Sequence, residues 1–253
     1  MFYSISNRLD ALAYWKEFVM SQPLKLQYFL DPLCGWCYAS APALAALAKQ
    51  FPTVLELMPT GLFSGAGARP MSKEWVEHAW RNDQRIAQMT GQIFSQAYHD
   101  QVLNGAGVHF DSSHATRALT AMRQITPALE PRLMHALQLA RYVDGRDTAK
   151  PDVVADVAAT VAALSELPFD KAQFAARLTN DAALEQATAQ RTASSQALMH
   201  RRGVSGVPLL WICTGAIEQA LHGSQLYQGG GSLITAIDSL LKASKGNQTP
   251  DAA

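Results

Sequence analysis

The sequence predicts an α/β protein in which a large all-helical insertion interrupts a small β-sheet. Strand-like runs occur in two segments, about 22–65 and 207–221, while the block between them, about 70–200, has almost no strand signal. Neither strand-bearing segment has enough strands to be stable alone, so the two are expected to pair with each other. A Cys-x-x-Cys pair, Cys34 and Cys37, directly follows the first strand-like run.

The first segment reads as strand, helix and strand. Residues 24–30 predict a strand, residues 37–50 a helix, and residues 54–58 a second strand. Strands that alternate with a helix at this spacing predict a parallel βαβ unit. The cysteine pair should therefore lie where the first strand gives way to the helix.

The middle block is rich in Ala, Leu, Gln and Arg, and its glycine and proline residues divide it into several helices. The expected helices are 72–102, 113–125, 131–143, 151–166, 170–178 and 181–202.

The last segment returns to strands. Residues 207–213 and 216–221 flank a Thr214-Gly215 turn and predict a β-hairpin. Ser232 then caps an amphipathic helix that continues to Lys242. The expected division is a discontinuous sheet domain at 22–68 and 203–244, a helical insertion domain at 69–202, an N-terminal amphipathic helix at 1–21, and a flexible tail at 245–253.

Composition excludes several classes of partner. The chain has 253 residues, of which 48% are hydrophobic and 17% charged, enough for a large buried core. Acidic and basic residues both number 21, with no basic stripe or acidic tail, so neither nucleic acid nor a membrane surface is expected as a partner. Thiol- or disulfide-containing proteins, or glutathione, are the expected partners, and the oligomeric state stays open.

The N-terminal residues bear on location. Charged residues interrupt the apolar residues of segment 1–20, whereas a signal peptide needs an uninterrupted apolar core. A cytoplasmic location is expected, or a periplasmic one if a leader has been removed. Three cysteines are too few for a secreted fold held together by disulfides.

Cys34 and Cys37 carry the expected chemistry. At a helix N-terminus, free backbone N–H groups and the positive end of the helix dipole stabilise a thiolate, so Cys34 is the expected nucleophile. Cys37 lies one turn further on and can close a small disulfide with it. A structural zinc site needs four ligands; Cys213 is the third cysteine, and no histidine pair lies near the motif, so no metal site is expected.

Four pieces of sequence occur in a characteristic order: Asp31-Pro32-Leu33-Cys34-Gly35-Trp36-Cys37-Tyr38, then Gly61-Leu62-Phe63-Ser64-Gly65 with Gly67-Ala68-Arg69-Pro70, then Gly107-Val108-His109-Phe110-Asp111, and finally Gly203-Val204-Ser205-Gly206-Val207-Pro208. This pattern resembles the DsbA-type thioredoxin-fold proteins, most closely the FrnE-like branch of candidate protein-disulfide isomerases. It overlaps with the patterns of 2-hydroxychromene-2-carboxylate isomerase and kappa-class glutathione transferase. The resemblance extends over about 24–244 and implies a thioredoxin-like fold with a helical insertion.

The resemblance also implies roles for further residues. Pro208 should be cis and face the dithiol, which would expose the backbone of Val207 as an edge for an extended peptide. Trp36 should line the same substrate groove. Pro42 matches a proline that kinks the active-site helix in thioredoxin-like proteins, or else it simply limits the helix.

Two positions depart from the pattern. Gly35-Trp36 replaces the Pro-His of strongly oxidising DsbA proteins and the Gly-Pro of thioredoxins, so a reduction potential between those families is expected. Tyr28 stands where DsbA itself carries an acid. Asp31 is the nearest acid in sequence and a candidate proton relay to Cys37, although an Asp before proline is equally a turn residue.

Together these observations predict a thiol–disulfide oxidoreductase or isomerase. Cys34 would form a mixed disulfide with a protein or small-thiol substrate, and Cys37 would resolve it. No cofactor is expected beyond the dithiol, with glutathione as a candidate co-substrate. One alternative is a glutathione-dependent isomerase or transferase with a pocket under the helical insertion, although such proteins usually have Ser at the position of Cys34. Another is a redox-sensing or chaperone-like binding protein.

Overall fold

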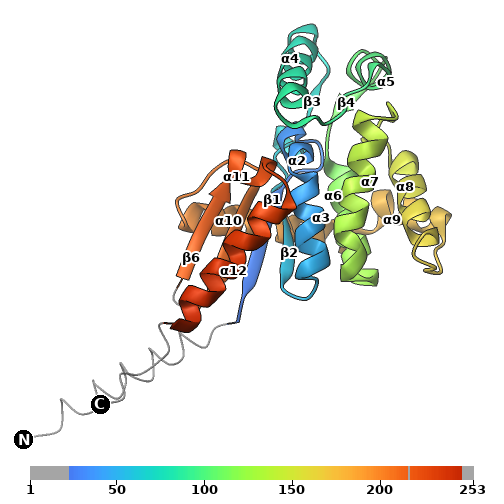
Figure 1. Ribbon diagram of the computed structural model, residues 1–253. Helices are drawn as coiled ribbons and strands as arrows, with labels where there is room; N and C mark the ends of the chain where they lie inside the picture. The colour runs from blue at the N-terminus through green and yellow to red at the C-terminus, as the bar shows by residue number, and fades with distance from the viewer. Residues whose placement is uncertain (1–22, 216, 247–253) are drawn as a thin grey trace, which may run out of the picture.

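A four-stranded sheet in the order β2-β1-β5-β6 joins the two strand-bearing segments of the chain (Figure 1). The computed structural model describes residues 23–215 and 217–246. The strands of this sheet are β1 (Lys25–Leu30), β2 (Leu55–Pro59), β5 (Leu209–Thr214) and β6 (Ile217–His222). β1 pairs in parallel with β2 and antiparallel with β5, and β5 pairs antiparallel with β6. The predicted βαβ unit and the predicted hairpin are therefore confirmed.

Helices make up most of the described chain. Between β1 and β2 lie α2 (Gly35–Ala39) and α3 (Ala41–Gln50). Between β2 and β5 lie η1 (Gly65–Gly67), α4 (Lys73–Thr90), α5 (Gln96–Tyr98), the π-helical turn η2 (His99–Leu103), α6 (Ser113–Ile125), η3 (Pro127–Leu129), α7 (Glu130–Tyr142), α8 (Pro151–Ala163), α9 (Lys171–Asn180) and α10 (Ala182–Arg201). After the hairpin come α11 (Ser224–Tyr227) and α12 (Gly230–Gly246).

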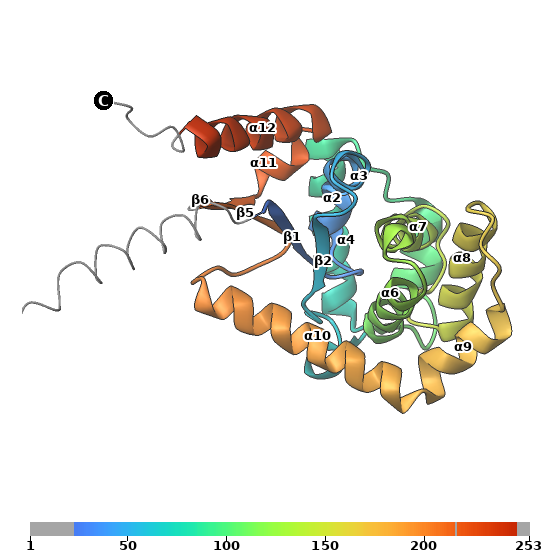
Figure 2. The ribbon, with the colours of Figure 1, turned by 90° about the horizontal axis from the view of Figure 1, so that it is seen from below.

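Helices cover both faces of the sheet. Figure 2 shows α3 and α12 on one face, α10 along the other, and α6 to α9 gathered to one side beyond β2. The side chains of β1 contact the helices on the two faces in turn, because successive residues of a strand point to opposite faces of the sheet. Tyr28 packs in the cluster that contains Leu47 of α3 and Ile237 of α12, and Phe29 packs in the cluster that contains Met199 of α10.

Two predicted helices are interrupted. The predicted helix 72–102 ends at Gly91, which adopts the left-handed conformation with φ of 75°, so α4 stops there and the chain resumes in α5 and η2. The predicted helix 37–50 is divided at Ser40 into α2 and α3. Pro42 stands in the first turn of α3, where its missing N–H removes no helical hydrogen bond.

The inserted block is not purely helical. β3 (Arg69–Pro70) pairs antiparallel with β4 (His109–Phe110), a ribbon that the sequence did not predict. Strands of two residues are too short for alternation of polar and apolar residues to reveal them.

The C-terminal helix is longer than predicted. α12 begins at Gly230 and continues to Gly246, so the first two residues of the predicted tail are helical. The predicted helix 1–21 and residues 247–253 lie outside the described residues, and the predicted domain boundaries stay a prediction.

The contact between α12 and α3 yields a matched pair of variants. A Cβ at Gly230 would lie 2.2 Å from Cβ of Ala46, whereas a Cβ at Gly231 would meet nothing within 4 Å. Gly230→Ala should lower the free energy of unfolding by about 1–3 kcal/mol because it overpacks this contact. Gly231→Ala should be neutral or raise it by a few tenths of a kcal/mol, because alanine favours helix more than glycine. Urea unfolding measures both, and equal effects would contradict the packing of α12 on α3.

Candidate active site

Cys34 lies at the N-terminal end of α2, directly after the turn that follows β1. It is the N-cap residue, and its sulfur accepts a hydrogen bond from the backbone N–H of Cys37 at 3.4 Å. Both thiols are free. The Cys34 side chain is 6% exposed and that of Cys37 only 1%, so an incoming substrate reaches Cys34 more readily.

The thiol of Cys37 is held in its protonated form. Burial raises its pKa well above the ordinary value, and the hydrogen bond and charge of Cys34 raise it further, while the backbone of Asp31 lowers it through a hydrogen bond. The two thiols therefore differ in environment although they lie one turn apart.

The loop before β5 faces the dithiol. The Val207-Pro208 peptide bond is cis, which confirms the conformation expected from the resemblance. The carbonyl oxygen of Val207 lies 3.7 Å from the Cys34 sulfur, which donates to it. Residues separated by 173 positions in the chain thus meet at the reactive sulfur.

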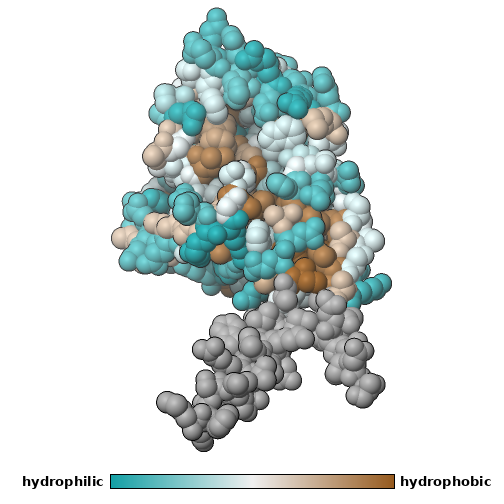
Figure 3. Space-filling view, turned by 90° about the vertical axis from the view of Figure 1, so that its left-hand side faces the viewer, coloured by the Kyte–Doolittle hydropathy of each residue, from teal (hydrophilic) through white to brown (hydrophobic). Residues whose placement is uncertain are grey.

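A pair of aromatic rings lies beside the dithiol. Trp36 stacks on Tyr227 of α11, with ring centroids 5.2 Å apart and an interplanar angle of 27°. Burial raises the pKa of Tyr227 to about 12, with smaller contributions from the charges of Cys34 and Cys37. Figure 3 shows that the face on the left-hand side of Figure 1 carries patches of hydrophobic surface. No local pattern in the sequence marks Tyr227 as part of the site, because it lies far from the motif along the chain.

Asp31 joins three segments around the motif. Its fully buried carboxylate accepts hydrogen bonds from the backbone N–H groups of Leu33 (2.9 Å) and Phe63 (3.1 Å) and from the Ser112 hydroxyl (2.9 Å). Burial raises the pKa of Asp31, and the three hydrogen bonds lower it. The effect of burial is the larger, so the pKa stays above its ordinary value. The carboxylate thus has a structural task, and its role as a proton relay stays a prediction.

Tyr28 fills the position where DsbA carries an acid. Its buried hydroxyl forms a hydrogen bond with the hydroxyl of Ser40, which in turn donates to the Cys37 carbonyl oxygen at 3.0 Å. Burial, followed by the charge of Cys37, raises the pKa of Tyr28 well above its ordinary value. This residue is a neutral phenol that ties β1 to the end of α2.

A buried acid that the sequence reading missed lies on α4. Asp83 is 4% exposed, and its carboxylate accepts a hydrogen bond from the Tyr98 hydroxyl at 2.9 Å. Burial raises the pKa of Asp83 to about 7, although Tyr98 and the charge of Arg141 lower it. Its signal in the sequence is its spacing, because Ala79, Asp83 and Ile86 share the buried face of α4.

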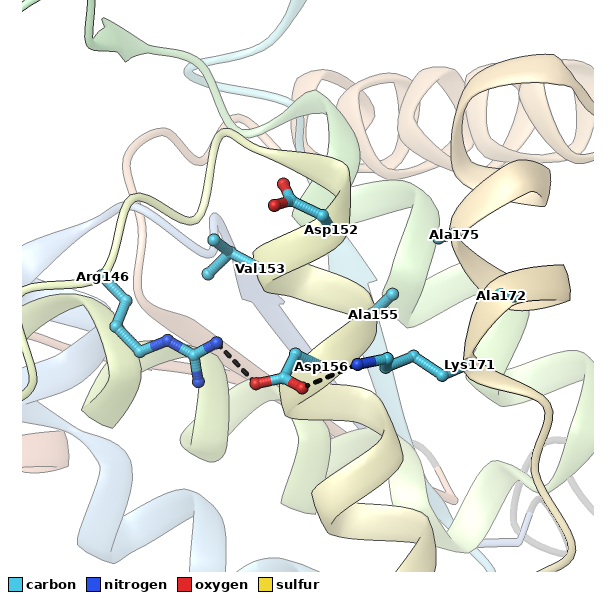
Figure 4. A pocket seen from close by; sticks show the side chains of 8 residues that line it. All are labelled: Arg146, Asp152, Val153, Ala155, Asp156, Lys171, Ala172 and Ala175. Atoms are coloured by element: carbon cyan, nitrogen blue, oxygen red, sulfur yellow. Dashed lines mark hydrogen bonds and ion pairs between the residues drawn. The ribbon is translucent and has the colours of Figure 1, made fainter.

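A pocket of about 270 Å³ between α8 and α9 is not part of this site (Figure 4). Arg146 and Lys171 both contact the carboxylate of Asp156, at 2.7 and 3.3 Å, so these three charges are already paired. Its lining comes from residues 146–175 and includes no residue of the dithiol motif.

The comparison with known families decides the identity of the fold. The model of the DSBA-like thioredoxin domain matches residues 25–229, which is most of the chain. The chain belongs to the DSBA-like thioredoxin family. The predicted fold class, a thioredoxin-like α/β fold with a large helical insertion, is thereby confirmed, while its FrnE-like branch stays a prediction.

Solved structures similar to this DSBA-like chain include the cytosolic disulfide reductase DsbM from Pseudomonas aeruginosa, which is 30% identical with a TM-score of 0.74 over 87% of this chain and 99% of that one. The same protein with GSH is 29% identical with a TM-score of 0.70, over 86% and 99%. A candidate protein disulfide isomerase from Nitrosomonas europaea, 22% identical with a TM-score of 0.66 over 88% and 99%, supports the fold. Among curated proteins, none matches the chain.

The described residues contain neither a membrane-spanning helix nor a metal-binding cluster. In residues 23–215 and 217–246 no helix combines the length and apolarity needed to cross a bilayer. In the same residues, no three His, Cys, Asp or Glu side chains are grouped so that they could hold a metal ion.

Asp83 should make the stability of this family member depend on pH. Its pKa is about 7 in the fold against an ordinary 3.8, so the native state binds an extra proton between these values and loses stability as the pH rises through that window. Asparagine does not titrate. The free energy of unfolding of Asp83→Asn, relative to the parent, should therefore rise by about 2–3 kcal/mol between pH 5 and pH 8, at about 1.4 kcal/mol per pKa unit. Urea unfolding at both pH values measures it, and a constant difference would contradict the prediction.

Proposed function

We propose that this chain is a disulfide reductase that acts through the Cys34–Cys37 dithiol. Membership of the DSBA-like family makes it a thiol–disulfide oxidoreductase, and a neighbour at 30% identity is named a disulfide reductase. One observation carries the proposal, the position of the Cys34 sulfur. This sulfur is the more exposed of the two and accepts a hydrogen bond from the backbone N–H of Cys37. It lies 3.7 Å from the carbonyl oxygen of Val207, the residue before cis Pro208. The reactive sulfur would thus lie next to the backbone edge of Val207, to which an extended peptide could bind.

The proposed reaction has two exchange steps. The Cys34 thiolate attacks one sulfur of a substrate disulfide, so that a Cys34–substrate disulfide forms and the other substrate sulfur leaves as a thiolate and takes up a proton. Cys37 then gives up its proton and attacks the Cys34 sulfur. The second substrate thiol is released, and Cys34 and Cys37 are left joined by a disulfide.

The resolving step requires a proton acceptor, because burial keeps Cys37 protonated at rest. Asp31 is the proposed acceptor, since its charge and its backbone both act on the Cys37 thiol. Its carboxylate is fully buried, so a proton taken from Cys37 would stay inside the protein until the substrate leaves.

The proposed substrate groove lies between the cis-proline loop and the aromatic pair. An extended peptide could pair with the backbone of Val207 while its disulfide meets Cys34. Trp36 and Tyr227, both half-buried and stacked on each other, would support the apolar side chains next to the disulfide. Pro208 lacks an N–H, so in this loop the edge is supplied by Val207.

Glutathione is the proposed reductant that restores the dithiol. Two glutathione thiols would reduce the Cys34–Cys37 disulfide and leave as one oxidised glutathione, which balances the two electrons given to the substrate. The DsbM neighbour is described as cytosolic and also with GSH, which supports both this reductant and a cytosolic location for this chain. In a reducing cytosol the dithiol would rest reduced.

Cysteine variants test the proposed mechanism. Insulin reduction in the presence of dithiothreitol should be abolished by Cys34→Ser, because no nucleophile remains. Cys37→Ser should instead accumulate a mixed disulfide with the substrate, visible in the intact mass under non-reducing conditions. Cys213→Ser, at a half-buried position of β5 outside the dithiol motif, is the matched control and should keep full activity. Glutathione transferase or isomerase activity that survives Cys37→Ser would contradict the proposal and favour the other enzyme class.

Equilibration with glutathione tests the direction of the reaction. The reduction potential of the Cys34–Cys37 couple should lie between that of thioredoxin, about −270 mV, and that of DsbA, about −120 mV, because Gly35-Trp36 provides no charged group beside the thiolate. Mass spectrometry of the alkylated protein over a range of GSH to GSSG ratios measures this potential. A value as high as that of DsbA would indicate an oxidase and would contradict the proposed reductase.

A further inference from the structure

The two edges of the sheet differ in how the rest of the fold covers them. β2 forms one edge, and α10 packs against it: Arg191 donates to the carbonyl oxygen of Leu57 at 2.6 Å, and Gln196 donates to that of Thr60 at 2.7 Å. β6 forms the other edge, on the side of the sheet away from α6 to α9 (Figure 1). Among residues 23–215 and 217–246, no strand pairs with the outer side of β6. Such an open edge can pair with another strand.

The backbone groups of alternate residues point out from this edge. His222 donates its backbone N–H to Oε1 of Gln225 at 3.3 Å, so this group points away from β5, although His222 lies opposite Leu209. In an antiparallel pair, the residues whose backbone groups face outward alternate along the strand. Glu218, Ala220 and His222 therefore present their N–H and C=O groups to the open edge. Gln225 binds one of these groups, and no other residue of the described chain forms a hydrogen bond with them.

β6 lacks the features that usually protect an edge strand from pairing. Its sequence, IEQALH over Ile217–His222, contains neither proline nor lysine. Its ladder with β5 continues without a break from the Thr214–Ile217 pair to the Leu209–His222 pair, so no bulge bends the strand. β6 is thus a regular strand of six residues with one side free to pair.

Two polar side chains stand on the same face of β6, on either side of its centre. Glu218 and His222 are exposed and flank the half-buried Ala220, and all three point to one face because side chains alternate along a strand. The carboxylate of Glu218 accepts a hydrogen bond from the thiol of Cys213 at the long distance of 3.7 Å. This contact leaves most of the accepting capacity of the carboxylate unused.

The carboxylate of Glu218 has no ion-pair partner in the described part of the chain. Its charge acts on Arg202, but the guanidinium of Arg202 lies 4.2 Å from the ring centroid of Trp211 and donates to Gln27 at 2.9 Å. The ion pairs between described residues include neither Glu218 nor His222. Glu218 is therefore available to a donor from another molecule.

We propose that β6 pairs with β6 of a second copy of this chain, antiparallel and about a two-fold axis at Ala220. This is the antiparallel register in which the three outward-facing residues pair with one another. Glu218 of each copy then lies opposite His222 of the other, with Cβ atoms about 5 Å apart. The two-fold axis makes both contacts identical, as in a self-complementary interface.

The groups that meet in this register are complementary. An imidazole has an N–H group to donate in either protonation state, and the carboxylate of Glu218 accepts it. At the centre, the two Ala220 residues exchange a pair of N–H···O bonds, and the N–H of Glu218 donates to the carbonyl oxygen of His222 in the other copy. The N–H of His222 exchanges its bond with Gln225 for one with the Glu218 carbonyl oxygen of the other copy. The two sheets thereby become one continuous sheet.

Charge variants test both the partner and the register. Glu218→Lys removes the carboxylate that faces His222, and His222→Glu places two carboxylates opposite each other. Each variant alone should therefore raise the dissociation constant of the dimer by about tenfold or more, because two opposite pairs are lost in each dimer. Mixed in equal amounts, the two variants should form a heterodimer at least as stable as the parent dimer, because each substituted side chain then faces an opposite charge. Native mass spectrometry over a range of protein concentrations separates heterodimer from homodimer. Glu77→Lys, an exposed position on α4, is the matched control and should leave the dissociation constant unchanged.

A proline variant tests the backbone pairing. The N–H of Ala220 points away from β5, so Ala220→Pro removes no hydrogen bond within the single chain, and proline is tolerated at such a position of an edge strand. It does remove the donor at the centre of the proposed interface. Ala220→Pro should therefore stay monomeric at every concentration at which the parent is a dimer. Near-UV circular dichroism checks that each variant is folded.

Three results would overturn the inference. The first is a parent chain that stays monomeric at all concentrations, including the case in which β6 binds an extended peptide instead. The second is a mixture of the charge variants that associates no better than its components. The third is a dimer that survives in folded Ala220→Pro, because another surface would then hold the two copies together. None of these measurements depends on turnover, so the inference and the proposed reductase activity stand or fall separately.

Discussion

The buried carboxylate of Asp31 is the interaction on which the arrangement of the active site depends. It accepts hydrogen bonds from the turn before Cys34, from the backbone of Phe63 in the loop after β2, and from Ser112 at the start of α6. The last two of these segments are also joined directly, because the backbone N–H of Ser112 donates to the carbonyl oxygen of Phe63 at 2.9 Å. A buried carboxylate without hydrogen-bond donors would lower the stability of the fold. The position of Asp31 and the positions of its three donors therefore depend on each other. Because Leu33 is one of the donors, the position of Cys34 at the start of α2 follows from the same contact.

The two cysteines differ because of what surrounds them and not because of their spacing. Cys34 accepts a backbone hydrogen bond, faces the cis-proline loop and is the less buried of the two, whereas Cys37 is almost fully buried and its pKa is raised. A mixed disulfide needs an accessible sulfur to form and a protected sulfur to resolve it. The packing of Tyr28 and Ser40 beneath α2 thus contributes to the proposed chemistry by keeping the second thiol buried and protonated.

The helical insertion does more than enlarge the fold. α4, α5 and α7 bring Asp83, Tyr98 and Arg141 together against the backbone of the motif, and Tyr142 binds the residue before Cys34. The sheet positions the sulfur, and the insertion places a buried carboxyl group and a buried guanidinium behind the motif.

The sequence alone determined the order of strands and helices, the place of the cysteine pair and the family. Each of these follows from local patterns: alternating and periodic apolar residues, the glycine and proline breaks, and a motif of neighbouring residues. The tertiary structure decided the partners of that motif. Asp83, Tyr227 and the β3–β4 ribbon act through contacts between segments far apart in the chain. Such contacts depend on how whole helices are oriented against the sheet, and neither the spacing nor the propensity of nearby residues contains that orientation.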